Sequence, residues 1–389
     1  IWVFEDDSFY VVGSEEELKS LAVSGYDEFD GNSPHRPWID SIEIKHPVTG
    51  LIGKRILDVG NPWLDAGIVP FSTLDYISDK DYWREWYPAD FVTECFPGQF
   101  RNWFYSLLAM SSWLDDSAPF KTLLGHALVK DENGREMHKS WGNAIWFDDA
   151  AEKMGVDVMR WLYASQNPER NLFFGYSIAD DVRKKIITLW NTYSFFITYA
   201  NLDGYDPENN ENIEKSLTKL DRWLLSKVDL FSITANNLYE DFRVYSLMDE
   251  ASVFLDELSN WYVRRNRRRF WKSENDENKN AAYYTLHTCL IKYLKIISPV
   301  IPFLSDYMYQ NLTNTSKSIH LSDYPLSEKG DVDEELIAEI NTLIEVVSLG
   351  RSARNKANIK IRQPLSSVII YCSDDKAQKY LLENKEDIL

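Results

Sequence analysis

The sequence has few cysteines, no long apolar run and fewer basic than acidic residues. Its three cysteines, Cys95, Cys289 and Cys372, lie far apart in 389 residues, so neither a disulfide framework nor a Cys-x-x-Cys metal site is indicated. No apolar stretch approaches the roughly 20 residues that span a bilayer, and no signal peptide is visible at the start. We therefore expect a cytoplasmic protein with no membrane partner.

The deficit of basic residues restricts which partners the chain can bind. There are 42 Lys and Arg against 61 Asp and Glu, giving a formal net charge of −19. This charge argues against general nucleic-acid affinity, so a nucleic-acid partner would need a local basic surface. His46 stands in a His-Pro-Val-Thr-Gly segment without cysteines. One histidine cannot hold a tetrahedral zinc ion, so we expect a turn residue and no zinc or other metal site.

What is present indicates a globular chain of two or three domains, with 44% apolar and 14% aromatic residues. The first part mixes short strands and helices, and long amphipathic helices follow from residue 177, so the fold class is α/β and then all-α. A capping box of Ser14 and Glu17 predicts a helix start. We expect strands at 1–4, 9–12, 55–59, 120–129 and 367–371. We expect helices at 147–154, 159–165, 283–308 (broken by Pro299 and Pro302) and 334–356.

One helix is predicted from a stripe of apolar residues at spacings of three and four. The stripe consists of Val244, Leu247, Ala251, Phe254, Leu258 and Trp261. An arginine-aromatic run, Trp-Tyr-Val-Arg-Arg-Asn-Arg-Arg-Arg-Phe-Trp, ends it at residues 261–271. Taken alone, such a run is more often a solvated face paired with carboxylates than a nucleic-acid site.

Two polar-aromatic segments suggest a ligand site. In residues 91–104 a β-rich run reaches Glu94, a Pro-Gly turn follows, and a helix opens on Gln99 and Trp103. Strand-turn-helix connections place polar groups at the carboxyl edge of a parallel sheet, where open α/β folds bind ligands. The second segment, residues 131–143, is a polar loop carrying Lys139 and Ser140. By itself this loop would usually be a solvated turn.

The second segment resembles the Lys-Met-Ser-Lys-Ser loop of class I aminoacyl-tRNA synthetases, although Glu136 and His138 replace the first lysine and serine. The resemblance implies catalytic roles for Lys139 and Ser140, and ATP binding by Met137 and Lys139, with Mg²⁺ accompanying the ATP.

Residues 91–104 resemble the amino-acid pocket of the isoleucyl-tRNA synthetases, although Gly98 replaces an aspartate. The resemblance implies that Glu94 accepts a hydrogen bond from the substrate ammonium, Gln99 bonds the aminoacyl or ribose part, and Trp103 forms an apolar wall. Residues 58–67 resemble a neighbouring pocket element, which makes Trp63 a second wall. A core aromatic role for Trp63 is about equally compatible with the sequence.

The arginine-aromatic run resembles the isoleucyl type of anticodon domain, as does the segment 349–364. The resemblance implies that Arg264, Arg265, Arg268 and Arg269 bind tRNA. We expect at least one of Arg264, Arg268 and Arg269 to be structural instead, because the same helix must also meet acidic neighbours.

The resemblance covers almost the whole chain and implies its organisation. Residues 1–154 would be the second half of a Rossmann-like catalytic domain and 155–177 a stem-contact region. Residues 178–365 would be a helical-bundle anticodon-binding domain and 366–389 the start of a truncated segment. The implied function is ATP-dependent ligation of isoleucine to tRNA(Ile) through isoleucyl-adenylate, by a monomer. The resemblance also implies a first half of the catalytic domain, with a His-x-Gly-His motif that holds ATP phosphate, and an editing domain. Neither occurs in this sequence, so we expect a carboxyl-terminal portion of the enzyme that is inactive alone. The alternatives are a valyl- or leucyl-type enzyme and a non-catalytic, synthetase-derived tRNA-binding protein.

Overall fold

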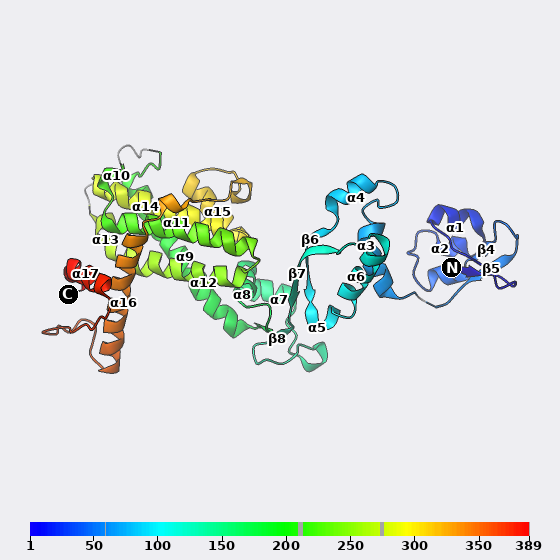
Figure 1. The fold of residues 1–389 in the computed structure, drawn as a ribbon, viewed down its shortest axis with the longest axis horizontal. Helices are drawn as coiled ribbons and strands as arrows, with labels where there is room; N and C mark the ends of the chain where they lie inside the picture. Colours follow the sequence, from blue (N-terminus) through cyan, green and yellow to red (C-terminus); the bar gives the residue numbers. More distant parts are fainter. Residues whose placement is uncertain (59, 209–212, 273–275, 389) are drawn as a thin grey trace. The chain divides into compact units, whose positions relative to one another are not determined.

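The computed structural model describes residues 1–58, 60–208, 213–272 and 276–388, drawn in Figure 1. The chain forms two compact units, residues 1–126 and 127–389. The division falls inside the predicted catalytic domain, within the strand expected at 120–129. The domain boundaries predicted after residues 154, 177 and 365 remain predictions.

The first unit begins with a five-stranded antiparallel sheet in the order β2-β1-β5-β4-β3. Its strands are β1 (Trp2–Val3), β2 (Phe9–Tyr10), β3 (Ala22–Ser24), β4 (Glu43–Lys45) and β5 (Ile52–Arg55). Helices α1 (Glu15–Leu21), α2 (Tyr26–Phe29) and the 3-10 helix η1 (Trp38–Ser41) accompany them. The core consists of Trp2, Phe4, Leu18, Phe29, Ile42 and Ile44.

The first two predicted strands are confirmed in shorter form, whereas the strand predicted at 55–59 is wrong. The ladder ends at Arg55, whose guanidinium turns to the Ile56 carbonyl (2.7 Å) and to Asp40. The Ile56 amide still donates to the Ile1 carbonyl at 3.0 Å, but residues 56–58 lead toward α3 and belong to no strand in the described ranges. Val59 lies outside those ranges.

The predicted capping box at α1 forms only in part. Ser14 Oγ accepts from the Glu17 amide at 3.1 Å, as expected. The Glu17 carboxylate instead accepts from the Gly13 amide (2.6 Å) and the Tyr10 hydroxyl (2.5 Å), which ties the helix start to β2. His46 is a turn residue, as predicted, because its Nδ1 accepts from the amides of Val48 and Thr49 at 3.0 and 3.2 Å.

The rest of the first unit is a small parallel sheet with helices. Strands β6 (Ala89–Cys95) and β7 (Phe120–His126) pair in parallel. The helices are α3 (Pro62–Ser72), α4 (Lys80–Trp86), α5 (Phe96–Gln99) and α6 (Trp103–Leu114). The parallel arrangement was predicted, and the strand predicted at 120–129 is confirmed in shorter form, as residues 120–126. The Ala127 amide donates to the Pro168 carbonyl at 2.8 Å, so the chain leaves β6 after His126.

The second unit opens with β8 (Val129–Asp131), which pairs in parallel with β9 (Leu172–Phe174). A 3-10 turn, η2 (Lys139–Trp141), precedes α7 (Phe147–Met154), whose bounds match the prediction. Helix α8 (Val156–Ala164) starts three residues earlier than expected. A single residue, Gly155 with φ 89°, makes the whole turn between these helices.

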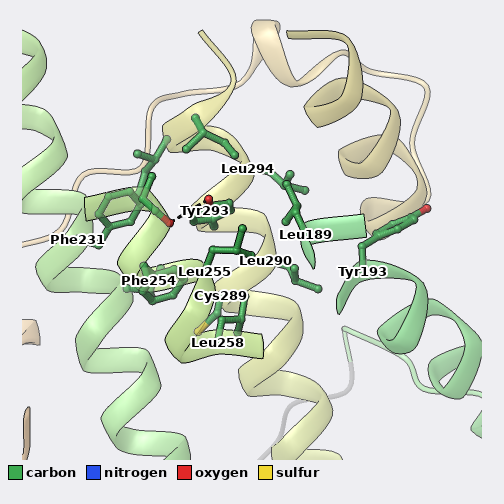
Figure 2. Close-up of a cluster of buried hydrophobic side chains, with 14 of the residues drawn as sticks. Leu189, Tyr193, Phe231, Phe254, Leu255, Leu258, Cys289, Leu290, Tyr293 and Leu294 are labelled. Atoms are coloured by element: carbon green, nitrogen blue, oxygen red, sulfur yellow. Dashed lines mark hydrogen bonds between the residues drawn. The ribbon is translucent and has the colours of Figure 1, made fainter. Parts of the chain in front are cut away.

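The remaining helices form a bundle around one large apolar core. They are α9 (Tyr176–Asp203), α10 (Ile213–Ser216), α11 (Lys219–Glu240), α12 (Val244–Asp256), the π-helical segment η3 (Glu257–Val263), α13 (Arg264–Trp271), α14 (Glu277–Ile297), α15 (Pro302–Thr313), the 3-10 turns η4 (Ile319–Leu321) and η5 (Lys329–Asp331), α16 (Glu334–Lys356), α17 (Asp375–Glu383) and α18 (Lys385–Ile388). Figure 2 shows Phe231, Phe254 and Tyr293 meeting at the centre of this core, where the Tyr293 hydroxyl donates to the Ala251 carbonyl at 3.1 Å.

The bundle follows the sequence prediction closely, with one exception. Helix α16 has the predicted bounds, α14 and α15 divide between Ile297 and Pro302, and the stripe from Leu247 to Trp261 is buried. The strand predicted at 367–371 is wrong, because this apolar run has no pairing partner among the described residues. Its Ile369 and Tyr371 are 94% and 93% exposed. In the described part of the chain, no helix combines the length and apolar character that crossing a membrane requires.

Candidate functional site

The crossing of α3 and α6 positions both predicted wall tryptophans. A Cβ atom on Gly67 would lie 2.7 Å from the Ser106 carbonyl oxygen, so only glycine lets the two backbones approach this closely. Trp103 begins α6, and its Nε1 donates to the Ala66 carbonyl on α3 at 3.2 Å. Trp63, one turn earlier on α3, is half-buried and outside the buried core clusters of the described residues. A wall role for both tryptophans stays a prediction.

The carboxylate of Glu94 lies at the carboxyl end of β6. The parallel register sets Glu94 opposite Gly125 and Cys95 opposite His126. Glu94 Oε1 accepts from the Cys95 amide at 2.7 Å and lies 4.0 Å from His126 Nε2. Both side chains are partly exposed, at 42% and 33%. The geometry leaves an anion that can accept hydrogen bonds from a cationic ligand.

His126 was not among the predicted site residues. The sequence contained one signal that could have identified it: two successive β-rich runs both end in ionisable residues, the first in Thr-Glu-Cys and the next in Leu-Gly-His. Parallel strands that are neighbours in a sheet bring their carboxyl ends to the same edge. Applying that rule to the second run as well as to the first would have placed His126 beside Glu94.

Gln99 lies at the end of α5 and contacts the start of α6. Its Oε1 accepts from the Trp103 amide at 3.3 Å. This leaves the amide nitrogen of Gln99 as the group that can meet a ligand. None of the four predicted pocket residues lines the nearby apolar cavity of about 500 Å³, whose wall includes Phe96, Phe100, Leu108 and Leu123.

The lysine loop in the second unit is organised by Asp131, which is buried at the end of β8. Its carboxylate accepts from the amides of Asn133 (3.0 Å) and Arg135 (2.8 Å) and from Asn143 Nδ2 (3.0 Å). These hydrogen bonds, led by that of the Arg135 amide, lower the pKa of Asp131. Asn143 also closes the loop by accepting from the His138 amide at 3.0 Å. The sequence showed an open polar loop and gave no sign of this closure.

Lys139 is exposed in η2, and its Nζ lies 4.5 Å from the centroid of the Trp146 ring. Ser140 follows it and is also exposed, and Gly142 with φ 71° ends the turn. Met137, predicted to bind ATP, is half-buried against the bundle core and anchors the loop. The two residues that depart from the family pattern contact each other, with His138 Nε2 3.2 Å from the Glu136 carboxylate. At η2 the loop therefore offers the Lys139 cation and the Ser140 hydroxyl to an anion, and Arg135 is a second exposed cation of the same loop.

The arginine-aromatic run lies on one continuous helix formed by α12, η3 and α13. A π turn inserts an extra residue and shifts the helix phase. The buried positions of α13 are Asn266 and Phe270, which continue at spacings of four from the buried Tyr262 of η3. This phase turns four arginines outward, which we call the arginine face: Arg264, Arg265, Arg267 and Arg268.

Two members of the arginine face lie near indole rings. The Arg265 guanidinium is 4.8 Å from the Trp261 ring centroid, and that of Arg267 is 6.0 Å from the Trp271 ring centroid. Within the described ranges, Arg264 and Arg268 form no ion pair. Arg269 differs, because its Nη1 and Nη2 donate to the Asp221 carboxylate at 2.7 and 2.8 Å. It is thus the structural arginine that the sequence led us to expect, and we assign it no tRNA contact.

Two families match this chain. Residues 3–174 match tRNA synthetases class I (I, L, M and V), and residues 221–370 match the anticodon-binding domain of tRNA ligase. The Lys139 loop falls in the first match and the arginine face in the second.

Curated relatives resemble nearly the whole chain. The isoleucine–tRNA ligase of Thermus thermophilus is 38% identical over 369 residues, which is 92% of this chain and 35% of that protein. That of Clostridium novyi is 36% identical over 95% of this chain and 36% of its own length. The chain therefore spans about a third of the length of the curated relatives it matches.

The fold also resembles a solved structure, a LeuRS–tRNA–LeuAMS ternary complex from Agrobacterium radiobacter K84. The TM-score is 0.56 at 15% identity, covering 77% of this chain and 36% of the other. At this identity the likeness concerns the fold alone.

Proposed function

This chain belongs to the class I tRNA synthetases, and we propose that it is part of an isoleucine–tRNA ligase. The observation that supports this most strongly is the 35–38% identity to isoleucine–tRNA ligases over at least 86% of the chain. The reaction would activate isoleucine with ATP and transfer it from isoleucyl-adenylate to tRNA(Ile). We further propose a cytoplasmic monomer with the domain boundaries predicted from the sequence.

The pocket residues have the chemistry that isoleucine requires. A free amino acid carries an ammonium group, and the partly exposed Glu94 carboxylate can accept charge-assisted hydrogen bonds from it. Its branched side chain needs apolar walls, which Trp103 and Trp63 on the crossing helices would supply. Gln99 would contribute its amide nitrogen to the aminoacyl or ribose part.

The lysine loop would act on phosphate. In the activation step the amino-acid carboxylate attacks the ATP α-phosphate, and pyrophosphate leaves. Negative charge grows on phosphate oxygens in the transition state, so an exposed cation and a hydroxyl donor lower the barrier. Lys139 and Ser140 would supply these groups, and Met137 would hold the loop against the bundle.

Mg²⁺ is assigned to ATP rather than to a protein site. Among the described residues, no group of three His, Cys, Asp or Glu side chains is placed to hold a metal ion. Mg²⁺ keeps several water ligands and often binds through substrate phosphates. Bound in that way, it would neutralise phosphate charge while Lys139 contacts the phosphate oxygens.

The proposal is tested by amino-acid-dependent ATP–pyrophosphate exchange in the full-length protein. Isoleucine should support exchange about 150-fold better than valine, the value known for isoleucyl enzymes, and leucine should support it weakly. Faster exchange with valine or leucine would favour the valyl- or leucyl-type alternative. No exchange with any amino acid, together with tight tRNA binding, would favour the non-catalytic tRNA-binding alternative.

A further inference from the structure

A second basic surface lies at the far end of α16. Five basic residues and no carboxylate occur between Glu345 and Asp374, although roughly one residue in six of the chain is acidic. We call these five residues the basic hook: Arg351, Arg354, Lys356, Lys360 and Arg362. None of them forms an ion pair within the described ranges, unlike the bundle lysines Lys219 and Lys292.

The hook begins in the carboxyl-terminal part of α16, which extends beyond the bundle core. The buried residues of this helix end at Leu343, and the following two dozen residues contain no buried side chain. Figure 1 shows this half of α16 running out from the other helices. A helix that extends beyond its own core without burying apolar area contributes little to folding stability. Folding therefore does not require the basic residues in this part of α16, and they can serve a binding role.

Arg354 folds the chain back so that the cations gather. After α16, Asn358 with φ 53° reverses the chain, and the Ile359 amide donates to the Arg354 carbonyl at 2.9 Å. Arg354 Nη1 then donates to the carbonyls of Lys360 (3.2 Å) and Gln363 (2.8 Å). Arg354 is thus half-buried and holds the turn after α16 closed, while the other four basic residues of the hook are exposed.

Compensation of the helix dipole accounts for only part of this charge. Cations in the last turn of a helix are favourable, which explains Arg354 and Lys356. Lys360 and Arg362 lie beyond the helix, and Arg351 lies before its last turn. Four exposed cations lie within residues 351–362 with no carboxylate among them, which favours a positive local potential on a chain of charge −19.

We infer that the basic hook binds the phosphodiester backbone of tRNA, as a contact additional to the arginine face. This rests on the proposed function. RNA fits better than an acidic protein or lipid surface because residues 351–362 lie inside the segment 221–370 that matches an anticodon-binding domain. The arginine face, with its own exposed cations, is in the same unit. Arg354 acts as a positioning residue, and the exposed four contact phosphate.

The test measures binding of a tRNA(Ile) transcript by the 389-residue chain as a function of salt. Lys360→Gln with Arg362→Gln should lower the log–log salt slope by about 1.5, since each phosphate contact contributes about 0.7–0.9. The matched control, Lys317→Gln with Lys329→Gln, removes the same charge from exposed positions of the same unit and should leave the slope unchanged. Arg354→Lys keeps the charge but cannot hold both carbonyls, so it should lower affinity several-fold.

The outcomes separate this inference from the proposed function. If the hook variant matches its control while Arg264→Gln with Arg268→Gln lowers the slope, the hook contact is refuted and the tRNA ligase proposal stands. If neither pair changes the slope, both tRNA contacts are refuted. If the hook variant instead loses binding to phosphatidylserine vesicles at an unchanged tRNA slope, the surface binds lipid and the inference is overturned. Unchanged circular dichroism of each variant confirms that the chain is folded.

Discussion

The Arg269 guanidinium and the Asp221 carboxylate form a bidentate ion pair that joins α13 to α11. Asp221 is fully buried, and the Arg269 side chain is 13% exposed. The same carboxylate accepts from the Tyr262 hydroxyl at 2.5 Å and from the Thr218 amide at 2.8 Å. Arg269 also donates to the Asn278 carbonyl at 2.6 Å, so it links three helices. This contact fixes α13 against α11 and α14.

Arg269→Gln should therefore destabilise the bundle and spare tRNA contacts. Removing one partner of a buried ion pair leaves an uncompensated charge and costs about 3–5 kcal/mol of unfolding free energy. Urea denaturation of the chain measures this cost. Arg268→Gln, its exposed neighbour, should change unfolding free energy by less than about 0.5 kcal/mol and lower the salt slope of tRNA binding by about one phosphate contact. A normal denaturation curve for Arg269→Gln would contradict the structural role.

Lys139→Ala should slow adenylate formation in the full-length protein far more than it weakens isoleucine binding. The reason is that charge on the phosphate grows toward the transition state, so a cation placed there acts differentially. ATP–pyrophosphate exchange gives kcat, and calorimetry gives the Kd for isoleucine. Arg135→Ala removes another exposed cation of the same loop and is the control. Exchange that kept its kcat after Lys139→Ala would show that the assignment of Lys139 is wrong.

Trp103→Ala should cost roughly 1–3 kcal/mol of isoleucine binding in the full-length protein, on the scale of one buried side chain. Trp103→Phe keeps an apolar wall but loses the Nε1 hydrogen bond to the Ala66 carbonyl, so it should lose less. Calorimetric Kd values for the two variants separate contact with isoleucine from support of the α3–α6 crossing. If both variants lost stability but neither changed the Kd, Trp103 would be a core residue only.

Asp131→Asn should loosen the lysine loop, because an amide cannot accept all the hydrogen bonds that the carboxylate accepts. Hydrogen exchange of the amides in 133–143 should become faster at neutral pH, while exchange in α14 should not change.

The lowered pKa of Asp131 sets the sign of the pH dependence of loop protection in the unsubstituted chain. The pKa of Asp131 is lowered in the folded state, so its contribution is complete above the unfolded value of about 3.9. That contribution is lost as pH falls through the lower folded pKa. Protection that rose on acidification would contradict this.

The bundle could be predicted from the sequence because its signals are local. Helix α16 begins after an Asp333 cap and ends where its periodicity stops, and no distant residue is needed to place it. Pro302 similarly fixes the start of α15 at the position that the sequence indicates. The buried stripe of α12 follows from spacing alone up to the π turn.

The errors have non-local causes. The strand expected at 367–371 is β-branched and apolar, but a strand also needs a neighbour with which to pair, and no periodicity reports that neighbour. The strand expected at 120–129 ends early because Ala127 bonds Pro168, some forty residues away. His126 beside Glu94 and Asp131 beside Asn143 were missed for the same reason. Arg269 could be expected to be structural only as one of a group, since its partner Asp221 lies on another helix.

The last prediction concerns residues 1–389 as a polypeptide: it should fold and bind tRNA weakly, but should not make isoleucyl-adenylate. The second unit has a large core of its own, with residues such as Trp223, Leu290 and Tyr293 fully buried. The parallel sheet that carries Glu94 has only two strands in the described ranges, and strand edges without partners leave backbone groups unpaired. No His-x-Gly-His occurs to hold phosphate opposite Lys139.

Activation depends mostly on holding two anions in the reacting geometry, so the loss of one side of the site removes effective molarity rather than a reactive group. ATP–pyrophosphate exchange by this polypeptide should therefore be undetectable, while the full-length protein is active under the same conditions and serves as the control. tRNA binding should remain measurable and fall steeply with salt, because the arginine face and the basic hook are both present. Exchange activity in a preparation proven to contain only residues 1–389 would overturn the view that these residues form only part of the catalytic site.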